Sequence, residues 1–395
     1  MAYTARRQTW TRFVIRTGLQ FAPPRSMVSS LDRHPSEFWV SLSLAFGRGT
    51  SALVAWLRDD RSRAPADSAA AEHAILEASA PARLERAGTL LVTAQQAGQS
   101  LVCWGDPTYP SLLRSLTDPP LVLWVKGDPG AWSPPCVALV GARNASGPAI
   151  EVARQLGRGL AAAGVSVVSG LAYGVDAAAH EGALEVGTTV AVLGSGLDRV
   201  YPPRHDVLGT RMVAQGGVLV SEFAPGTPPL RHHFPQRNRI VSGLSLGVVI
   251  VEAGETSGAL ITARAALDQG RDVMVVPGAV AGGRNRGGHA LLKDGAALVE
   301  GLDDVLTVLR GSPLWVTPAR SVAGRVAGKM EAGPGTHRAG LSALPTAWSC
   351  GETMDLIEIQ RLVGRGPEGV AVLLLDWELA GCIARTPDGR FVRRG

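Results

Sequence analysis

The sequence contains little that would place the protein in a membrane or in an oxidising compartment. Only four of its 395 residues are cysteine, and they lie far apart without a CxxC pair. This spacing argues against a disulfide framework and a cysteine metal site, so we expect a reduced, cytoplasmic protein. A run of about 18 apolar residues is missing, which excludes a membrane-spanning helix. Arg6 and Arg7 are not followed by an apolar segment, so we expect no signal peptide.

Charged residues are also few, at 18% of the chain against 46% hydrophobic residues. That balance provides enough apolar surface for a folded core and excludes a wholly disordered chain. Basic residues exceed acidic ones by 39 to 34, a net charge of +5, which permits a polyanionic partner without requiring one. Lysine occurs only at positions 126, 293 and 329. Codon composition explains part of this scarcity, but an anion site would still have to be built from arginine.

The N-terminal quarter of the chain predicts two segments. Residues 1–35 are rich in arginine and lack apolar periodicity, so we expect a basic, poorly ordered leader. Residues 36–98 show helical spacing at about 37–59 and 68–87, with a Gly47-Arg48-Gly49 turn. They predict a small helical domain.

Residues 99–310 alternate short β-branched runs with alanine-rich helical runs. The apolar runs are continuous, which is typical of parallel strands buried on both faces. We therefore predict an α/β fold, a doubly wound Rossmann-like parallel sheet covered by helices on each side. The expected strands lie at 137–140, 165–168, 189–193, 218–220, 248–251 and 273–276.

The C-terminal part of the chain predicts a linker and a third domain. Residues 311–345 are rich in Gly, Pro, Ala, Ser and Thr, as in a flexible basic linker. Residues 346–395 contain two helical patterns, at 355–363 and about 369–379, followed by a hairpin pattern. Helix, turn, helix and hairpin in this order predict a winged-helix-like domain.

Ligands of doubly wound sheets bind beyond the carboxyl ends of the strands, and the loop after strand 137–140 is the first candidate. It reads GARNASG, beginning at Gly141, and lacks the GxGxxG dinucleotide fingerprint. Arg143, followed by small residues that open a helix, would offer a phosphate a guanidinium and free backbone N–H groups. An ordinary turn with a solvated arginine is the alternative.

The segment after the second strand contains Asp176 at the start of a helix and His180 one turn into it, which could suggest a catalytic pair. Asp176 is expected to cap the helix that follows, and His180 to be a packing histidine. Because no nucleophile or metal ligand lies nearby in the sequence, we expect no catalytic residue, metal or cofactor.

The segment after Glu222 reads RHHFPQRNR, from Arg231 to Arg239. An aromatic ring beside guanidinium groups is typical of a platform for single-stranded nucleic acid. The His232-His233 pair lacks a third metal ligand at a sensible spacing. As an alternative to phosphate contact, we expect one of the two arginines at positions 237 and 239 to pair with Glu222 or Glu252.

Ser257 and Gly258 open a helix after the strand at 248–251, and a helix N-terminus favours anions. Many Gly-Ser turns bind nothing, so this signal is weak alone. Arg284 and Arg286, in a glycine-rich loop, complete the rim of the expected site.

Seven ordered motifs together resemble the DNA-processing protein DprA/Smf family. They are GARNAS, SGLAYGVDAAAH, AVLGSGLDRVYP, SEFAPG, FPQRNRI, VEAGETSGALIT and VPGAVAGGRNRGGHALLKDGA, between about residues 102 and 300. The resemblance implies a single-stranded-DNA-binding protein of natural transformation, without enzymatic activity, which protects incoming strands and loads the RecA recombinase. It also implies a homodimer built through the Rossmann-like domain, a SAM-like or helix-hairpin-helix domain in front, and a winged helix behind.

The same resemblance implies where DNA is bound. The contact residues would be Gly141, Arg143, His233, Phe234, Arg237, Asn238, Arg239, Ser257 and Gly258. Two departures from the family pattern occur: Ala142 replaces a frequent Ser or Thr, and histidines precede Phe234 where some members have Lys. A contact through these histidines would depend on pH.

Two other functions are compatible with the predicted architecture. A nucleotide phosphoribohydrolase of the LOG-like class would carry PGGxGTxxE at the phosphate turn, but no acid follows Ser257 within the first helical turn. A module that only scaffolds partners would bind no oligonucleotide.

Overall fold

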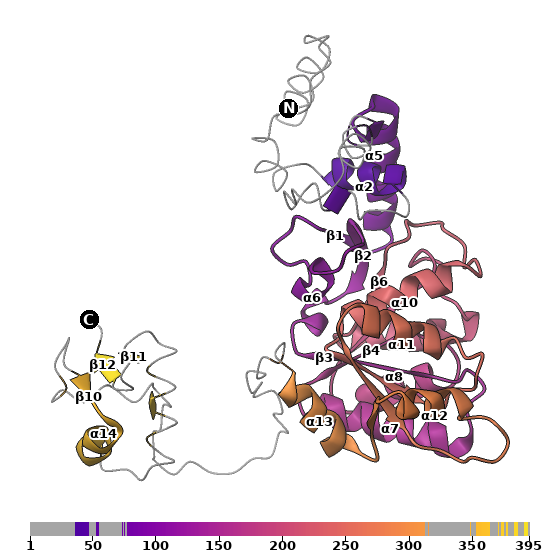
Figure 1. Cartoon of the computed structure of the whole chain (residues 1–395). Helices are drawn as coiled ribbons and strands as arrows, with labels where there is room; N and C mark the ends of the chain where they lie inside the picture. The colour runs from indigo at the N-terminus through magenta and orange to yellow at the C-terminus, as the bar shows by residue number, and fades with distance from the viewer. Residues whose placement is uncertain are drawn as a thin grey trace, which may run out of the picture. The chain divides into compact units, whose positions relative to one another are not determined.

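The computed structural model describes residues 36–46, 53–54, 73, 75, 77–312, 315, 348, 353–363, 370, 373–374, 377, 383–385 and 391–393. The chain divides into two compact units, Met1–Val322 and Ala323–Gly395 (Figure 1). The expected leader at 1–35, the Gly47-Arg48-Gly49 turn and most of the expected linker at 311–345 lie outside the described residues. None of the described helices is long and apolar enough to span a bilayer.

The first unit is built on a nine-stranded sheet with the order β1-β2-β6-β5-β4-β3-β7-β8-β9. Strands β3 to β9 run parallel to one another, whereas β1 and β2 form an antiparallel edge that joins β6. The strands are β1 Ser100–Cys103, β2 Val122–Gly127, β3 Cys136–Gly141, β4 Ser166–Ser169, β5 Thr189–Val192, β6 Val218–Ser221, β7 Gly247–Val251, β8 Asp272–Val276 and β9 Ala297–Leu298.

The chain winds in two directions from the central strand β3. It passes through β4 and β5 to β6 on one side, then crosses back so that β7 pairs with β3 on the other side. The point where the strand order reverses therefore lies between β3 and β7, which pair up to Gly141 and Val251. This topology confirms the predicted doubly wound α/β fold.

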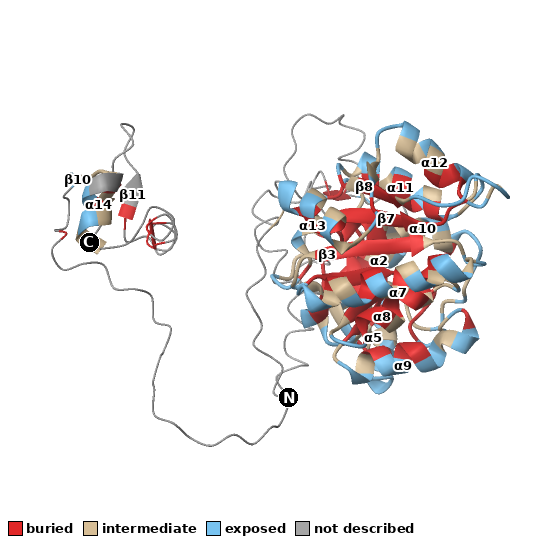
Figure 2. Cartoon of the chain, turned by 90° about the horizontal axis from the view of Figure 1, so that it is seen from below, coloured by how far each residue is buried: buried red, intermediate tan, exposed pale blue. Residues whose placement is uncertain are grey.

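Helices cover both faces of the sheet because successive side chains of each strand point to opposite faces (Figure 2). Val137 and Leu139 of β3 belong to the same buried cluster as residues of α7, α8 and α13. Ala138 and Val140 belong to the cluster formed with α10 and α11. The helices of this unit include α2 Ser36–Phe46, α5 Pro81–Gln96, α6 Ser111–Arg114, α7 Gly147–Ala162, α8 Val175–Ala183, α9 Asp206–Ala214, α10 His233–Gly243, α11 Ala259–Asp268, α12 Arg286–Lys293 and α13 Leu302–Gly311.

The N-terminal helices contact the antiparallel edge of the sheet. Phe38, Trp39 and Leu42 of α2 are buried in one cluster with Trp124 of β2, and α5 contacts β1. The described part of the segment 36–98 thus shares a core with the sheet. The helix expected up to residue 87 extends to Gln96 as α5. The likeness of this segment to SAM or helix-hairpin-helix domains stays a prediction.

The second unit contains β10 Thr353–Met354, α14 Leu356–Val363, β11 Ile383–Arg385 and β12 Phe391–Arg393. The strands form an antiparallel sheet in the order β10-β12-β11. Its core contains Trp348, Ile359, Leu374, Trp377 and Phe391. The expected first helix and the hairpin are present, and most of the expected second helix lies outside the described residues. The winged-helix assignment stays a prediction.

Candidate nucleic-acid interface

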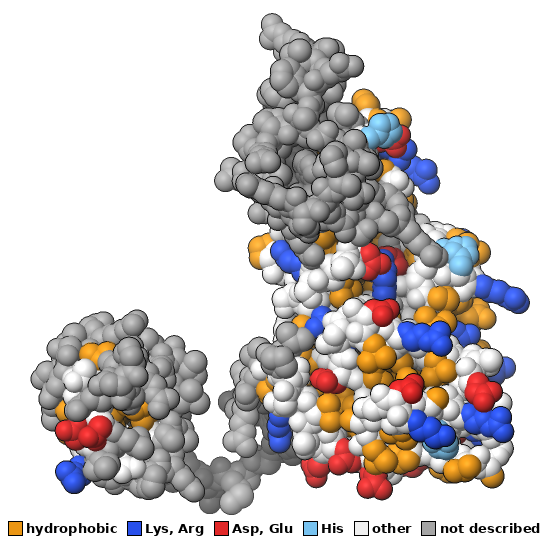
Figure 3. Space-filling view, viewed as in Figure 1, with side chains coloured by type: hydrophobic (Ala, Val, Ile, Leu, Met, Phe, Trp, Pro, Cys, Tyr) orange, Lys and Arg blue, Asp and Glu red, His pale blue; other side chains and the backbone are white. Residues whose placement is uncertain are grey.

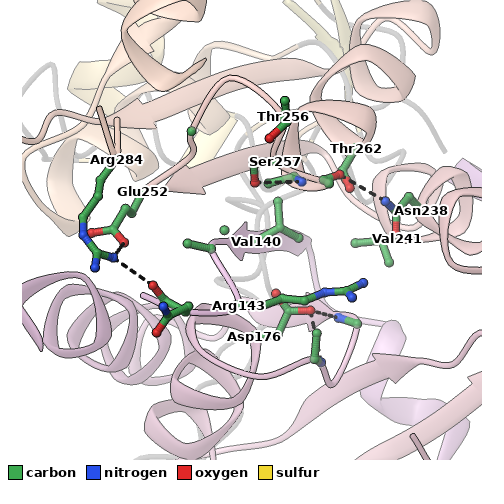
Figure 4. Close-up of a pocket in the computed structure, with 18 of the residues that line it drawn as sticks. Val140, Arg143, Asp176, Asn238, Val241, Glu252, Thr256, Ser257, Thr262 and Arg284 are labelled. Atoms are coloured by element: carbon green, nitrogen blue, oxygen red, sulfur yellow. Dashed lines mark hydrogen bonds and ion pairs between the residues drawn. The ribbon is translucent and has the colours of Figure 1, made fainter. Parts of the chain in front are cut away.

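A pocket of about 500 Å³ lies beyond the carboxyl ends of β3 and β7, where the strand order reverses. Ligands of open α/β sheets bind at such a point. In Figure 4, Arg143 and Asp176 lie opposite Asn238, Ser257 and Thr262, with Arg284 and Glu252 at one end. The pocket is lined by Val140, Gly141, Ala142, Arg143, Asn144, Gly170, Ala172, Asp176, Arg237, Asn238, Val241, Glu252, Gly254, Thr256, Ser257, Gly258, Ala259, Thr262 and Arg284.

Arg237 of α10 places a buried positive charge in the wall of this pocket. Its guanidinium donates hydrogen bonds to the carbonyl oxygens of Gly170, at 2.7 Å, and Val192. Burial lowers the pKa of Arg237 to about 10, although the nearby carboxylate of Asp176 acts in the opposite direction. The side chain is therefore still cationic near neutral pH. It fits because residue 170 is glycine: a Cβ there would lie 2.5 Å from the Arg237 guanidinium.

Asp176 holds the loop that follows β4. Its carboxylate accepts hydrogen bonds from the backbone N–H groups of Gly170, at 3.0 Å, and Ala172, at 3.3 Å. The expectation that Asp176 caps α8 is wrong, because the capping position is Gly174, whose φ of +75° suits glycine. Burial raises the pKa of Asp176, and Arg237 and the backbone N–H groups oppose that shift.

Arg143 is the exposed cation of the loop between β3 and α7. Its guanidinium carbon lies 5.5 Å from the centre of the Phe234 ring, a cation–π arrangement. No ion pair holds Arg143 among the residues that the structure describes. The guanidinium is thus positioned by an aromatic face and not neutralised by an acid.

Glu252 joins three of the loops around the pocket. Its carboxylate accepts hydrogen bonds from the backbone N–H of Ser146, at 3.0 Å, and from the Ser146 hydroxyl, at 2.5 Å. The Arg284 guanidinium lies 3.4 Å away and also donates to the carbonyl oxygen of Asn144, at 3.0 Å. Glu252 has a φ of +54°, an unusual conformation for a residue with a side chain. This carboxylate is therefore used to order the loops.

The N-terminus of α11 contributes backbone groups to the pocket. Ser257 accepts a hydrogen bond from the backbone N–H of Ala259, at 3.3 Å, and Asn238 donates to the carbonyl oxygen of Gly258, at 3.4 Å. A helix N-terminus carries a partial positive charge that favours anions. Together with Arg143, it gives the pocket the chemistry of a phosphate site.

Comparison with known proteins connects this geometry to a family. Residues 100–310, which contain the whole pocket, match the family described as DNA recombination-mediator protein A. The chain belongs to this family. It is 37% identical to Protein Smf of Escherichia coli strain K12, over 75% of this chain and 78% of that protein. It is 42% identical to DNA processing protein DprA of Streptococcus pneumoniae, over 51% of this chain and 71% of that protein.

A solved structure agrees with the sequence relatives. The X-ray structure of DNA processing protein A from S. pneumoniae superposes with a TM-score of 0.57 at 33% identity. The alignment covers 69% of this chain and 98% of that one. The resemblance of the seven motifs to the DprA/Smf family is thereby confirmed.

Six of the nine residues expected to contact DNA line the pocket in this recombination-mediator fold: Gly141, Arg143, Arg237, Asn238, Ser257 and Gly258. Phe234 lies beside it through its contact with Arg143. The structure does not bring Arg239 there, because its guanidinium lies 2.5 Å from Glu222 and 3.3 Å from Asp118. The expected pairing of one arginine with Glu222 or Glu252 is confirmed for Arg239.

His233 does not line the pocket either. It is buried and stacks on Phe223, with 4.1 Å between ring centres. A pH-dependent contact through this side chain is therefore not supported. His180 is buried as well, with Nδ1 at 2.8 Å from the hydroxyl of Thr189, outside the pocket. Among the described residues, no three His, Cys, Asp or Glu side chains are placed to hold a metal ion.

The sequence reasoning missed that the segment around Phe234 is helical. Arg237, Ile240 and Val241 are buried along α10, and their i, i+3, i+4 spacing was the available signal. It also missed the structural role of Glu252, whose partners come from other loops, and that of Asp176, whose partners lie four and six residues earlier in its own loop.

Proposed function

We propose that this family member binds single-stranded DNA, with one or more phosphates held at the pocket beyond β3 and β7. The observation that carries the proposal is the Arg143 guanidinium, which is exposed, free of acids among the described residues, and placed over Phe234 at the mouth of an anion-favouring pocket. The guanidinium suits a phosphate, and the ring beside it suits a base.

The charge distribution supports local recognition at the pocket. On the face in Figure 3, the Lys and Arg side chains of the described residues are spread among acidic and hydrophobic ones. Within the pocket, the two carboxylates of Asp176 and Glu252 are occupied by hydrogen bonds from the protein. The guanidinium of Arg143 is therefore available to an anion, and the Arg284 side chain, 53% exposed beside Glu252, can add a second contact.

In the cell, the proposed role is the one that the family likeness implies. The protein would act as a cytoplasmic homodimer in DNA processing during natural transformation and recombination. It would protect incoming strands and load RecA recombinase, without chemistry of its own. The absence of an acidic residue from the first turn of α11 supports binding over a LOG-like hydrolase. Release of base from a nucleoside monophosphate would contradict this part of the proposal.

Salt-dependent binding to an oligothymidylate, followed by fluorescence anisotropy, tests the proposal. If Arg143 and Arg284, the exposed cations of the pocket, each meet a phosphate, the slope of log K against log salt should be about −1.4. Arg239 adds no phosphate contact to this value, because it is paired with Glu222. Duplex DNA of the same sequence should bind more weakly.

Replacement of Arg143 distinguishes phosphate binding at the pocket from a general effect of the protein's charge on DNA affinity. Arg143→Ala should flatten the slope by about 0.7 and weaken binding by about 1.5–3 kcal/mol. Arg239→Ala is the matched control, because it removes the same charge from an ion pair outside the pocket. It should lower the free energy of unfolding and leave the slope unchanged. Equal slopes in wild type and Arg143→Ala would contradict the proposal.

A further inference from the structure

An exposed tyrosine contacts Phe234, the aromatic residue beside the pocket. Tyr201, in the loop between β5 and α9, is 44% exposed. Its ring centre lies 5.5 Å from that of Phe234, at an interplanar angle of 47°. Phe234 in turn has the Arg143 guanidinium over its ring, so the three side chains form a continuous series outward from the pocket.

This series is fixed by ordered backbone. Phe234 lies against Gly194, where a Cβ would be 3.1 Å from its ring carbon Cδ1. The loop before Tyr201 is held by the Ser195 hydroxyl, which donates to the carbonyl oxygen of Arg199 at 2.7 Å. Tyr201 is therefore presented to solvent by a loop with its own hydrogen bonds.

One cationic side chain, that of Arg199, lies two residues before Tyr201 and offers a guanidinium to a phosphate. Arg199 is 58% exposed, and its contact with Asp198 is long, at 3.9 Å. The Asp198 carboxylate also accepts hydrogen bonds from the backbone N–H of Gly226, the shorter at 2.9 Å. The Asp198 carboxylate is thus shared between Gly226 and Arg199, while most of the Arg199 side chain stays exposed to solvent.

We infer that Tyr201 is a second base-stacking residue, so that a single strand held at Arg143 continues across Phe234 to Tyr201. This inference rests on the proposed function and adds the direction in which the single strand leaves the pocket. The strand leaves the pocket over the carboxyl ends of β5 and β6, away from the β8–α12 loop that carries Arg284. Because every base has a π face, the subsite accepts any nucleobase.

The test compares four proteins for binding to a long oligothymidylate: wild type, Tyr201→Ala, Tyr201→Phe and Tyr173→Ala. Tyr173 is the matched control. It is 42% exposed on the neighbouring β4–α8 loop, but its ring contacts His205, with centres 5.0 Å apart, and not Phe234. Tyr201→Ala should weaken binding roughly 5- to 30-fold. Tyr201→Phe and Tyr173→Ala should bind like wild type.

Three results would overturn the inference. Wild-type affinity in Tyr201→Ala would show that no base stacks there, and an equal loss in Tyr173→Ala would show that contact with Phe234 is irrelevant. A flatter salt slope in Tyr201→Ala would mean that the change acts through phosphate contacts, since tyrosine carries no charge near neutral pH.

A measurement on the unaltered protein removes any dependence on variant folding. A single strand with 5-iododeoxyuridine at successive positions, irradiated on wild type, should crosslink to the peptide that contains Tyr201 from at least one position. Binding without such a crosslink would overturn the inference and leave the proposed function standing. No oligonucleotide binding by wild type at all would overturn both.

Discussion

At the scale of single residues, arginines that are close in sequence have different surroundings. Arg237 is buried and bonded to two carbonyl oxygens, and Arg239, two positions later, is paired with Glu222 and Asp118. On a helix, two positions correspond to about 200° of rotation, so the two side chains leave α10 on different sides. Composition alone cannot make this distinction, because it depends on where the helix packs. Arg143, on a loop, is exposed.

His180 leads to a prediction about stability and pH. Burial, followed by the positive groups of His205 and Arg237, lowers the pKa of His180 to about 3 from the ordinary 6.5. Its Nδ1 bonds with Thr189, whose hydroxyl donates to the carbonyl oxygen of Val167, so Nδ1 is the protonated nitrogen. Nε2 has no hydrogen-bond partner among the described residues. A second proton would therefore be buried without compensation.

The direction of the pH effect on stability depends on which state, folded or unfolded, binds a proton at His180. Between pH 6.5 and about 3 the unfolded chain protonates His180 and the folded protein does not. The contribution of neutral His180 to the free energy of unfolding is thus complete above pH 6.5. It falls as the pH drops, by about 1.4 kcal/mol per pH unit. His180→Gln should remove this slope, as measured by urea unfolding at pH 7 and pH 5. An unchanged difference between the two pH values would refute the assignment.

At the scale of elements, the sequence predicted the strands whose positions follow from a hydrophobic pattern. The six expected apolar runs are the strands β3 to β8, because strands buried on both faces must be apolar throughout. The antiparallel edge of β1 and β2 was missed. Trp124 and Val125 of β2 are buried as well, but a short strand without the repeated βα order has no distinguishing pattern. The helix α10 was missed because Arg237 is one of its buried residues.

The contact between the β4–α8 loop and α10 leads to a prediction for Gly170. A Cβ at this position would lie 2.5 Å from the Arg237 guanidinium, so Gly170→Ala should displace the charge from its two carbonyl partners. We expect a loss of about 1–3 kcal/mol in the free energy of unfolding, together with weaker DNA binding. Gly147→Ala, at a position where a Cβ would meet nothing within 4 Å, is the control and should leave both quantities unchanged. Wild-type stability in Gly170→Ala would show that the guanidinium has room to move.

At the scale of the whole molecule, the candidate DNA-binding residues all belong to one of the two compact units. Every residue that lines the pocket, and the Phe234 and Tyr201 rings beside it, lies within Met1–Val322. The second unit has its own core around Trp348, Trp377 and Phe391. Nothing in the pocket therefore requires residues 323–395 for its shape.

A chain that ends after Val322 should consequently fold and bind an oligothymidylate with an affinity within about threefold of the full chain, or about 0.7 kcal/mol. Its salt slope should also be unchanged, because the slope counts phosphate contacts and the pocket that makes them is retained. Circular dichroism and urea unfolding establish that the shortened chain is folded before binding is compared. A folded chain with a much flatter slope would place phosphate contacts on the second unit, as a DNA-binding winged helix would require. It would contradict the view that the first unit alone carries the affinity.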